Sequence, residues 1–189
     1  MFQVFDNIID EKEQTELSDY FLKPVFPYYL SAGFNFNTVS QKLFEKNKDL
    51  YTKESKLLVH TFYYEGKVIS HAYSIVEALL HKFIIKTNLN FKIIFRAKLN
   101  LQFKHENYDE KYYTTPHIDS TNEHKVLIYY PINSDGNTIL FKKENEKYTI
   151  IDKIEPKQGR FLLFDGNTYH AAQPPMKNDF RLTLNFNII

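Results

Sequence analysis

Three side chains in the second half of the chain are suited to hold a metal ion. His117 and Asp119 are two residues apart at the end of a polar loop, and His170 follows the apolar run GRFLLF and the turn DGNTY. On a strand, residues two apart point to the same side, so the imidazole and the carboxylate would converge. Two His and one carboxylate can occupy one face of an octahedral Fe(II) ion and leave its other positions open. The pattern therefore predicts a metal site.

A cationic side chain follows the last of these residues at a short interval. Arg181 comes eleven positions after His170, within FRLTLNF, which we interpret as a strand packed inside a barrel and apolar on both sides. A guanidinium is costly to bury unless an anion waits for it. Arg grips a carboxylate with two parallel hydrogen bonds, and Thr183, facing the same way, could add a hydroxyl donor. The alternative is an ion pair with a nearby Asp or Glu.

The first half of the chain carries the signals of helices. Asp10 with Glu13 forms a capping-box pattern, which predicts a helix over 11–23. Ser70 is a candidate N-cap for a second helix. Its apolar residues recur at helical spacing, as expected for a core-facing stripe: Ile75, Val76, Leu79, Leu80, Phe83 and Ile84.

From about Phe91 the pattern changes to that of strands. Short runs of β-branched and aromatic residues alternate with period two and are divided by turn signals. The expected strands lie within 91–103, 125–133, 137–143, 147–155, 159–166 and 181–189. Many short strands without intervening helices indicate an antiparallel barrel or sandwich. We therefore expect a single domain over 1–189, with helical support in 1–90 and a β core in 91–189.

Composition narrows the classes of partner and compartment. The chain of 189 residues has 24 basic and 23 acidic residues, a balance that does not favour nucleic acid. It has no Cys, so a metal must be bound by His, Asp or Glu. The first residues lack the pattern of a signal peptide, and no apolar run is long enough to span a membrane. A cytoplasmic protein without membrane contact is the expectation.

The order H-x-D, about fifty residues, H, about eleven residues and R-x-T resembles that of the 2-oxoglutarate/Fe(II)-dependent dioxygenases. The similarity covers Phe91–Ile189 and is closest to prolyl-hydroxylase-like members of the short bacterial and phage type. It implies a double-stranded β-helix (jelly-roll, cupin-like) core that uses Fe(II), 2-oxoglutarate and O₂. By the same resemblance, iron would be held by His117, Asp119 and His170. The distal carboxylate of 2-oxoglutarate would be bound by Arg181, assisted by Thr183.

Two further positions enter through the same resemblance. Tyr130, in Ile128-Tyr129-Tyr130, aligns with a Tyr that helps to hold 2-oxoglutarate, and Tyr129 takes that role if the register slips by one. Asn100 aligns with the Asn of an N-x-Y element, although Gln102 stands where that Tyr is found. The alternative interpretation of these residues is sheet core.

The resemblance implies an oxygenase that hydroxylates an unactivated C–H bond and releases succinate and CO₂. The presence of Asp119 favours hydroxylation over halogenation. Three alternatives stay open: a cupin-like metal-binding protein or isomerase that does not turn over 2-oxoglutarate, a nucleic-acid demethylase, and a non-enzymatic β-sandwich. The substrate is expected to be a small molecule, an amino acid or a peptide. The polar segment 105–116 could be a mobile lid or a fixed surface loop, and His105 and His124 could line the entrance beside it.

Overall fold

The protein folds mainly into β-strands, with two helices in the described part of its first half. The computed structural model describes residues 1–30, 57–91, 93–104, 109–145 and 147–189. The helices are α1 (Glu11–Leu22) and α3 (Tyr73–Thr87). The strands are β1 (Phe2–Phe5), β2 (Tyr29–Leu30), β3 (Leu57–Tyr64), β4 (Lys67–Val68), β5 (Ile94–Phe103), β6 (Lys125–Tyr129), β7 (Thr138–Glu144), β8 (Lys147–Ile154), β9 (Phe161–Asp165), β10 (Tyr169–Ala172) and β11 (Phe180–Ile188).

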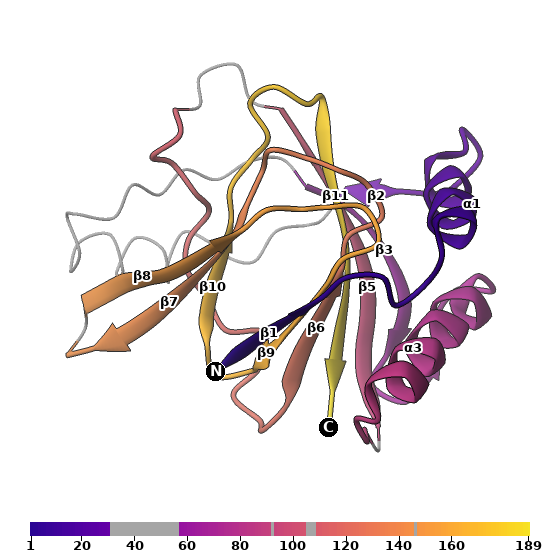
Figure 1. The fold of residues 1–189 in the computed structure, drawn as a ribbon, viewed down its shortest axis with the longest axis horizontal. Helices are drawn as coiled ribbons and strands as arrows, with labels where there is room; N and C mark the ends of the chain where they lie inside the picture. Colours follow the sequence, from indigo (N-terminus) through magenta and orange to yellow (C-terminus); the bar gives the residue numbers. More distant parts are fainter. Residues whose placement is uncertain (31–56, 92, 105–108, 146) are drawn as a thin grey trace.

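The described strands form two antiparallel sheets. The larger has the order β1-β9-β6-β11-β5-β3-β2, with β4 paired to β3, and the smaller has the order β10-β7-β8. The smaller sheet lies opposite one face of the larger, and both helices lie on the other face (Figure 1). This architecture agrees with the β core predicted from the pattern of short strands.

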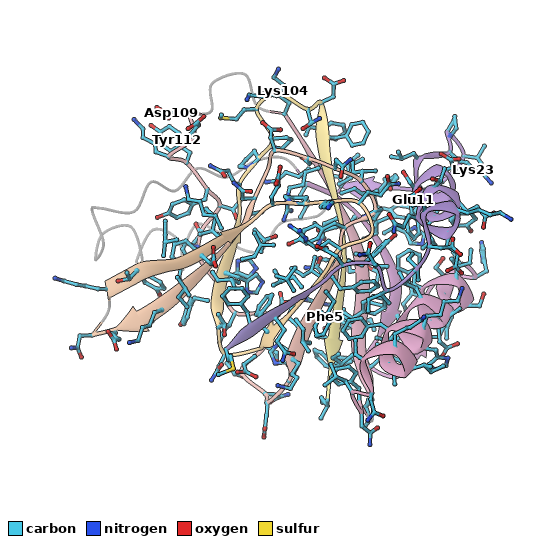
Figure 2. The ribbon with its side chains drawn as sticks, viewed as in Figure 1. Phe5, Glu11, Lys23, Lys104, Asp109 and Tyr112 are labelled. Atoms are coloured by element: carbon cyan, nitrogen blue, oxygen red, sulfur yellow. The ribbon has the colours of Figure 1, made fainter. Side chains whose placement is uncertain are left out.

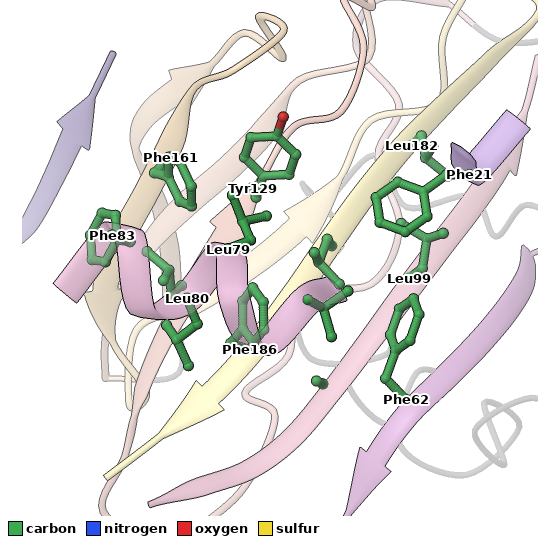
Figure 3. Close-up of a cluster of buried hydrophobic side chains, with 14 of the residues drawn as sticks. Phe21, Phe62, Leu79, Leu80, Phe83, Leu99, Tyr129, Phe161, Leu182 and Phe186 are labelled. Carbon is green, nitrogen blue, oxygen red and sulfur yellow. The ribbon is translucent and has the colours of Figure 1, made fainter. Parts of the chain in front are cut away.

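The larger core lies between the large sheet and the helices. Phe21 of α1, Phe83 of α3 and Phe186 of β11 are fully buried there, and Figure 3 shows them among the other aromatic and aliphatic side chains of this cluster. Burial of each such ring removes about 150–250 Å² from water. The alternation of β11 assigns Leu182, Leu184 and Phe186 to this side and leaves the intervening residues for the opposite face.

A smaller apolar cluster joins the two sheets. Side chains from both sheets project into the space between them (Figure 2). Val126 and Ile128 of β6 and Phe164 of β9 pack there against Leu140 of β7 and Ile154 of β8. On the large sheet, these apolar residues lie on β6 and β9, so β5 and β11 are left to present polar residues to the same space.

Both predicted helices lie where the sequence placed them, but the N-cap predicted for the second helix was wrong. α1 begins after Asp10, whose side chain accepts a hydrogen bond from the backbone N–H of Glu13 at 2.9 Å. Ser70, in contrast, is not the N-cap of α3, because that helix begins after Ala72. The Ser70 hydroxyl accepts from the Ala72 N–H at 3.2 Å and bonds to the ring of His60 instead.

Several strands were not predicted. β1 and β3 belong to the large sheet although they lie in the part of the chain expected to be helical, and β10 carries one of the predicted metal ligands. β1 pairs with β9, and β3 pairs with β5, across large separations in sequence. Neither described helix has the length and apolar character that crossing a membrane requires.

The segment 105–116 lies partly outside the described residues, because 105–108 are not among them. Its last residues are fixed to β10. The Thr114 backbone N–H donates to the carbonyl of Ala172 at 2.8 Å, and the Thr114 hydroxyl accepts from the Ala172 N–H at 2.9 Å. Tyr113 is buried and packs its ring against Phe141. Of the two alternatives for this segment, a mobile lid or a fixed surface loop, the contacts of Tyr113 and Thr114 favour the fixed loop for these two residues.

Candidate metal centre

The structure brings the three predicted metal ligands together from two places in the fold. His117, in the loop before β6, forms an antiparallel bridge with His170 of β10, with backbone hydrogen bonds of 3.0 and 2.9 Å. The two imidazole centroids are 4.6 Å apart. Nε2 of His117 lies 3.9 Å from Oδ1 of Asp119. One ligand atom from each residue lies within 4.8 Å of the others.

Each imidazole is oriented by the carbonyl two residues before it. Nδ1 of His117 is 3.0 Å from the carbonyl oxygen of Thr115, and Nδ1 of His170 is 3.2 Å from that of Thr168. An Nδ1–H that donates to a carbonyl fixes the tautomer in which Nε2 carries the free lone pair. Both rings are thereby prepared to bind a metal through Nε2.

The carboxylate of Asp119 is held on both of its oxygens. Nη2 of Arg96, on β5, lies 2.7 Å from Oδ1, and Nδ2 of Asn187, on β11, donates to Oδ2 at 2.8 Å. Nε of Arg96 also donates to Oδ1 of Asn187 at 2.8 Å, which closes the network. Two adjacent strands of the large sheet thus fix a ligand that itself lies in a loop.

The electrostatics favour the protonation states that metal ligation requires. Burial, and then the neighbouring His117, lower the pKa of His170 to about 4, so its imidazole is neutral near pH 7. Burial alone would raise the pKa of Asp119. His170, Arg96 and His117 outweigh it, and the pKa of Asp119 lies well below its ordinary value. The site therefore offers a neutral imidazole at His170 and a carboxylate at Asp119, beside the second imidazole of His117.

This donor set fits a divalent transition metal with open positions. Two imidazoles and one carboxylate are the ligands of mononuclear non-haem Fe(II) sites. The orienting hydrogen bonds around all three match what metal ligands in proteins receive from their surroundings. The separation of 3.9 Å between Nε2 of His117 and Oδ1 of Asp119 leaves room for an ion between them.

Removing the amide that holds Asp119 is expected to weaken metal binding. In Asn187→Leu, Oδ2 of Asp119 loses its hydrogen bond without any change of charge, so affinity for Co(II), used as a stable substitute for Fe(II), should fall roughly tenfold. Anaerobic titration calorimetry measures this. Asn133→Leu, at a turn where the amide accepts from Gln158, is the control. Unchanged affinity in Asn187→Leu would show that the amide does not position the carboxylate.

Arg181 lies in a second polar site at the other end of β11. Its side chain is buried, and no ion pair with a carboxylate is found for it among the described residues. Nε donates to the carbonyl of Gly136 at 2.7 Å, and Nη2 donates to the hydroxyl of Thr138 at 2.6 Å. Tyr130 donates its hydroxyl to the same Thr138 oxygen at 2.8 Å. The predicted pair of Arg181 and Tyr130 is thus joined through Thr138.

Gly136 is required at this point by the close approach of other atoms. A Cβ at Gly136 would lie 2.5 Å from the carbonyl oxygen of Gln173 and 3.0 Å from Cδ of Arg181. Any larger residue would displace either the backbone or the guanidinium. The bonds at Gly136 and Thr138 occupy only two of the five N–H donors of Arg181, and the guanidinium retains capacity for an anion.

Thr183 and Asn100 lie next to this site as cross-strand partners on β11 and β5. Both share with Arg181 the face of the large sheet that points toward the small sheet, here called the inner face. Tyr129 lies on the opposite face, in the large core. The expectation that the Arg181 strand is apolar on both sides was wrong. Period two places Arg181, Thr183, Asn185 and Asn187 on one face, and that face is polar.

Two of the unassigned histidines have local structural partners. His60 is buried, contacts the carbonyl of Pro27 and the hydroxyl of Ser70 at 2.8 Å each, and stacks among aromatic rings. His124 is also buried and packs directly over Gly166, where no Cβ would fit. The predicted role of His124 at a substrate entrance has no support in this packing, and His105 lies outside the described residues.

Several residues of the site were not identified from the sequence. Arg96, Thr138 and Gly136 contact predicted site residues from other strands and turns. One signal was available: Arg96, Lys98, Asn100 and Gln102 follow period two, and such an array of polar residues in a predicted core strand indicates a polar inner face. Which residues lie opposite them depends on the strand order.

Comparison with protein families gives one match. A sequence model of the 2OG-Fe(II) oxygenase superfamily matches residues 103–189, which include the three candidate metal ligands and Arg181. No curated protein sequence matches the chain.

Solved structures resemble the chain over almost all of its length. A 2OG-Fe(II) oxygenase family oxidoreductase from Burkholderia pseudomallei is 12% identical, with a TM-score of 0.66 over 99% of this chain and 84% of that one. A prolyl hydroxylase of Trichoplax adhaerens, solved with a hypoxia inducible factor peptide, is 17% identical, with a TM-score of 0.59 over 100% and 83%. The alpha-ketoglutarate-dependent epimerase SnoN of nogalamycin biosynthesis is 11% identical, with a TM-score of 0.62 over 100% and 77%. These likenesses show the fold and confirm the predicted double-stranded β-helix.

Proposed function

We propose that the chain is a 2OG-Fe(II) oxygenase that uses Fe(II), 2-oxoglutarate and O₂ to hydroxylate an unactivated C–H bond. The match of that superfamily's sequence model to residues 103–189 supports the class. The observation that carries the proposal is that the candidate metal centre and the Arg181 site both lie on the inner face of the large sheet. One end of β11 contacts the candidate metal ligand Asp119, and the other end carries a buried Arg181 without a carboxylate partner among the described residues.

In this proposal His117, Asp119 and His170 hold Fe(II). Their donor types, the carbonyls that orient both imidazoles and the network around the carboxylate support this role. Bound Fe(II), together with 2-oxoglutarate and O₂, would supply the oxidation of the substrate C–H bond. The protein holds the three ligands in place, keeps His170 and Asp119 largely away from water, and leaves His117 the most exposed of the three, with 40% of its side chain accessible.

Arg181 binds the distal carboxylate of 2-oxoglutarate in this proposal. A desolvated guanidinium that lacks a protein carboxylate is suited to pair with one from a ligand. Thr138, which accepts from both Arg181 and Tyr130, sets the orientation of the guanidinium and the phenol, so the Tyr130 ring borders the same carboxylate. Thr183 and Asn100 form the next cross-strand pair after Arg181 and Gln102, on the side toward the candidate metal centre. They would line the space between the two sites.

The substrate proposed is a small molecule, an amino acid or a peptide. The Trichoplax adhaerens structure of the same fold holds a peptide, and the SnoN structure is that of an epimerase. Asp119 supplies a carboxylate where a halide would otherwise need room, which favours hydroxylation. Because a similar fold serves epimerisation, the product has to be identified and not only the consumption of 2-oxoglutarate.

The test is anaerobic titration of Fe(II) and 2-oxoglutarate, followed by exposure to O₂ with a panel of amino acids, peptides and small metabolites. We expect one metal ion per chain, 2-oxoglutarate binding that depends on the metal, and succinate release stimulated by a panel member. Mass spectrometry should then find a product 16 Da heavier than the substrate, the addition of one oxygen atom that defines hydroxylation.

Three outcomes would contradict the proposal. Metal binding without any affinity for 2-oxoglutarate would favour the cupin-like metal-binding protein or isomerase. Succinate release with a product of unchanged mass would retain the oxygenase class and exclude hydroxylation. The absence of metal binding would leave a β-sandwich with accidental motifs.

A further inference from the structure

The inner faces of β5 and β11 form a ladder of four polar pairs that runs between the two sites. Because the strands are antiparallel and in register, Arg96 faces Asn187, Lys98 faces Asn185, Asn100 faces Thr183 and Gln102 faces Arg181. The first pair holds Asp119 of the metal centre, and the last contains the Arg181 guanidinium. Successive pairs are about 7 Å apart along the strands, so the two central pairs lie between the sites.

Lys98, Asn100 and Asn185 in the central pairs differ from Arg96, Asn187 and Arg181 in their hydrogen bonding. Arg96, Asn187 and Arg181 all have protein partners. Lys98 is mostly buried, yet no hydrogen bond or ion pair is found for it among the described residues. Within the same described part of the chain, the side-chain oxygens of its cross-strand partner Asn185 and of its neighbour Asn100 are buried without a hydrogen-bond partner. Buried polar atoms in native proteins are almost always bonded, so this group of three is incomplete without a ligand.

The balance of charge in the ladder indicates the sign of the charge on that ligand. Arg96, Lys98 and Arg181 are cationic, and among the described residues Asp119 is the carboxylate found in contact with the ladder. A divalent metal and the dianion 2-oxoglutarate cancel one another, so an excess of positive charge persists when both are bound. Burial, and then Arg96, lower the pKa of Lys98 to about 8, as expected for an ammonium without a counter-ion.

We infer that Lys98, with Asn100 and Asn185, forms a carboxylate-binding subsite between the metal centre and Arg181. The Lys98 ammonium would donate to a carboxylate oxygen, and each amide offers both a donor and an acceptor to neighbouring ligand atoms. The inference rests on the proposed function. The carboxylate comes either from 2-oxoglutarate, as the 1-carboxylate beside its oxo group, or from the primary substrate. Lys98 is then a specificity-determining residue in addition to Arg181.

A purely structural role does not explain why a Lys occupies position 98. A Lys kept for packing extends its ammonium to solvent or pairs with a carboxylate. Lys98 lies in the middle of β5, with β11 on one side and β3 on the other, and it faces Asn185 and Thr61 across these strands. An apolar residue would fill such a position without the cost of desolvating a charge.

The test compares ligand binding to the full chain loaded with Co(II) without O₂. The variants are Lys98→Met, which keeps the length of the side chain and removes its charge, and Lys98→Arg, which keeps the charge. Lys125→Met is the matched control, because Lys125 pairs with the exposed Asp165.

Two pairs of ligands are titrated. The first pair is 2-oxoglutarate and succinic semialdehyde, which lacks the 1-carboxylate. The second pair is L-glutamate and succinate, titrated against both the Co(II)-loaded chain and its complex with 2-oxoglutarate.

If the subsite takes the 1-carboxylate, Lys98→Met should weaken 2-oxoglutarate binding roughly 10- to 100-fold, leave succinic semialdehyde unaffected, and be partly rescued by Lys98→Arg. If it takes a carboxylate of the primary substrate, 2-oxoglutarate binding is unchanged. Binding of L-glutamate or succinate to the 2-oxoglutarate complex is then lost in Lys98→Met and kept in Lys125→Met.

Two results overturn the inference. One is equal binding of all four ligands by the wild type and Lys98→Met. The other is an equal loss for 2-oxoglutarate and succinic semialdehyde, since Lys98 would then act through the fold. Failure of the wild type to bind 2-oxoglutarate contradicts the proposed function instead. In that case the L-glutamate and succinate titrations of the Co(II)-loaded chain still decide whether Lys98 binds a carboxylate.

Discussion

Replacing Asp119 by Ala is expected to remove metal binding and, with it, all metal-dependent turnover of 2-oxoglutarate. The variant loses the anionic ligand of the set and leaves two imidazoles, of which one is 40% exposed. It also leaves Arg96, whose side chain is 14% exposed, without its carboxylate partner. A nearly buried charge that loses its partner costs about 3 kcal/mol, so the free energy of unfolding should fall as well.

Metal content by elemental analysis and stability by urea denaturation measure the two effects separately. Asp165→Ala is the control, because its carboxylate is 44% exposed and pairs with Lys125 at the surface. A folded Asp119→Ala protein with the metal content and turnover of the wild type would show that the metal centre lies elsewhere.

Replacing Arg181 by Met is expected to weaken 2-oxoglutarate binding at least roughly 100-fold, because a desolvated, charge-assisted pair is strong. Metal affinity should change little, since the hydrogen bonds of Arg181 within the described residues go to Gly136 and Thr138 and not to the three candidate metal ligands. Removal of a buried guanidinium that has no carboxylate partner among the described residues also removes a desolvation penalty. The ligand-free variant should therefore be as stable as the wild type or more stable.

Calorimetric titration of the Co(II)-loaded protein measures the 2-oxoglutarate affinity, and thermal unfolding measures the stability. Arg160→Met is the matched control, because Arg160 pairs with Asp6 outside the site. Retention of 2-oxoglutarate affinity in Arg181→Met would assign the anchor to another residue. The Lys98→Met titration distinguishes that residue from Lys98.

The parts of the fold that local pattern specifies were predictable from the sequence. Period-two runs located most strands of the β core, and the capping box at Asp10 located α1. Ser70 failed as a cap because its hydroxyl is shared with His60, a contact across ten residues that no local signal reports. β1 and β3 were missed because their strand identity comes from pairing with β9 and β5.

The candidate site divides in the same way. His117, Asp119, His170 and Arg181 could be chosen as candidates because their residue types and order carry the chemistry. The side chains that position them could not be, because their roles depend on which strands are neighbours. Arg96 becomes a partner of Asp119 only once β5 lies beside β11. Lys98 becomes an ammonium without a partner, within the part of the chain that the structure describes, only when Asn185 faces it across the strands.

The candidate ligands come from both sheets, which makes the proposed metal a cross-link in the fold. His170 belongs to the small sheet, whereas Asp119 is tied to β5 and β11 of the large one. An ion that binds only the folded chain adds about 2.7 kcal/mol to the free energy of unfolding at one hundred times its dissociation constant. The melting temperature then rises with the concentration of free metal. Chelation would loosen one sheet from the other, and preparations of identical sequence would differ in heat resistance according to their metal loading.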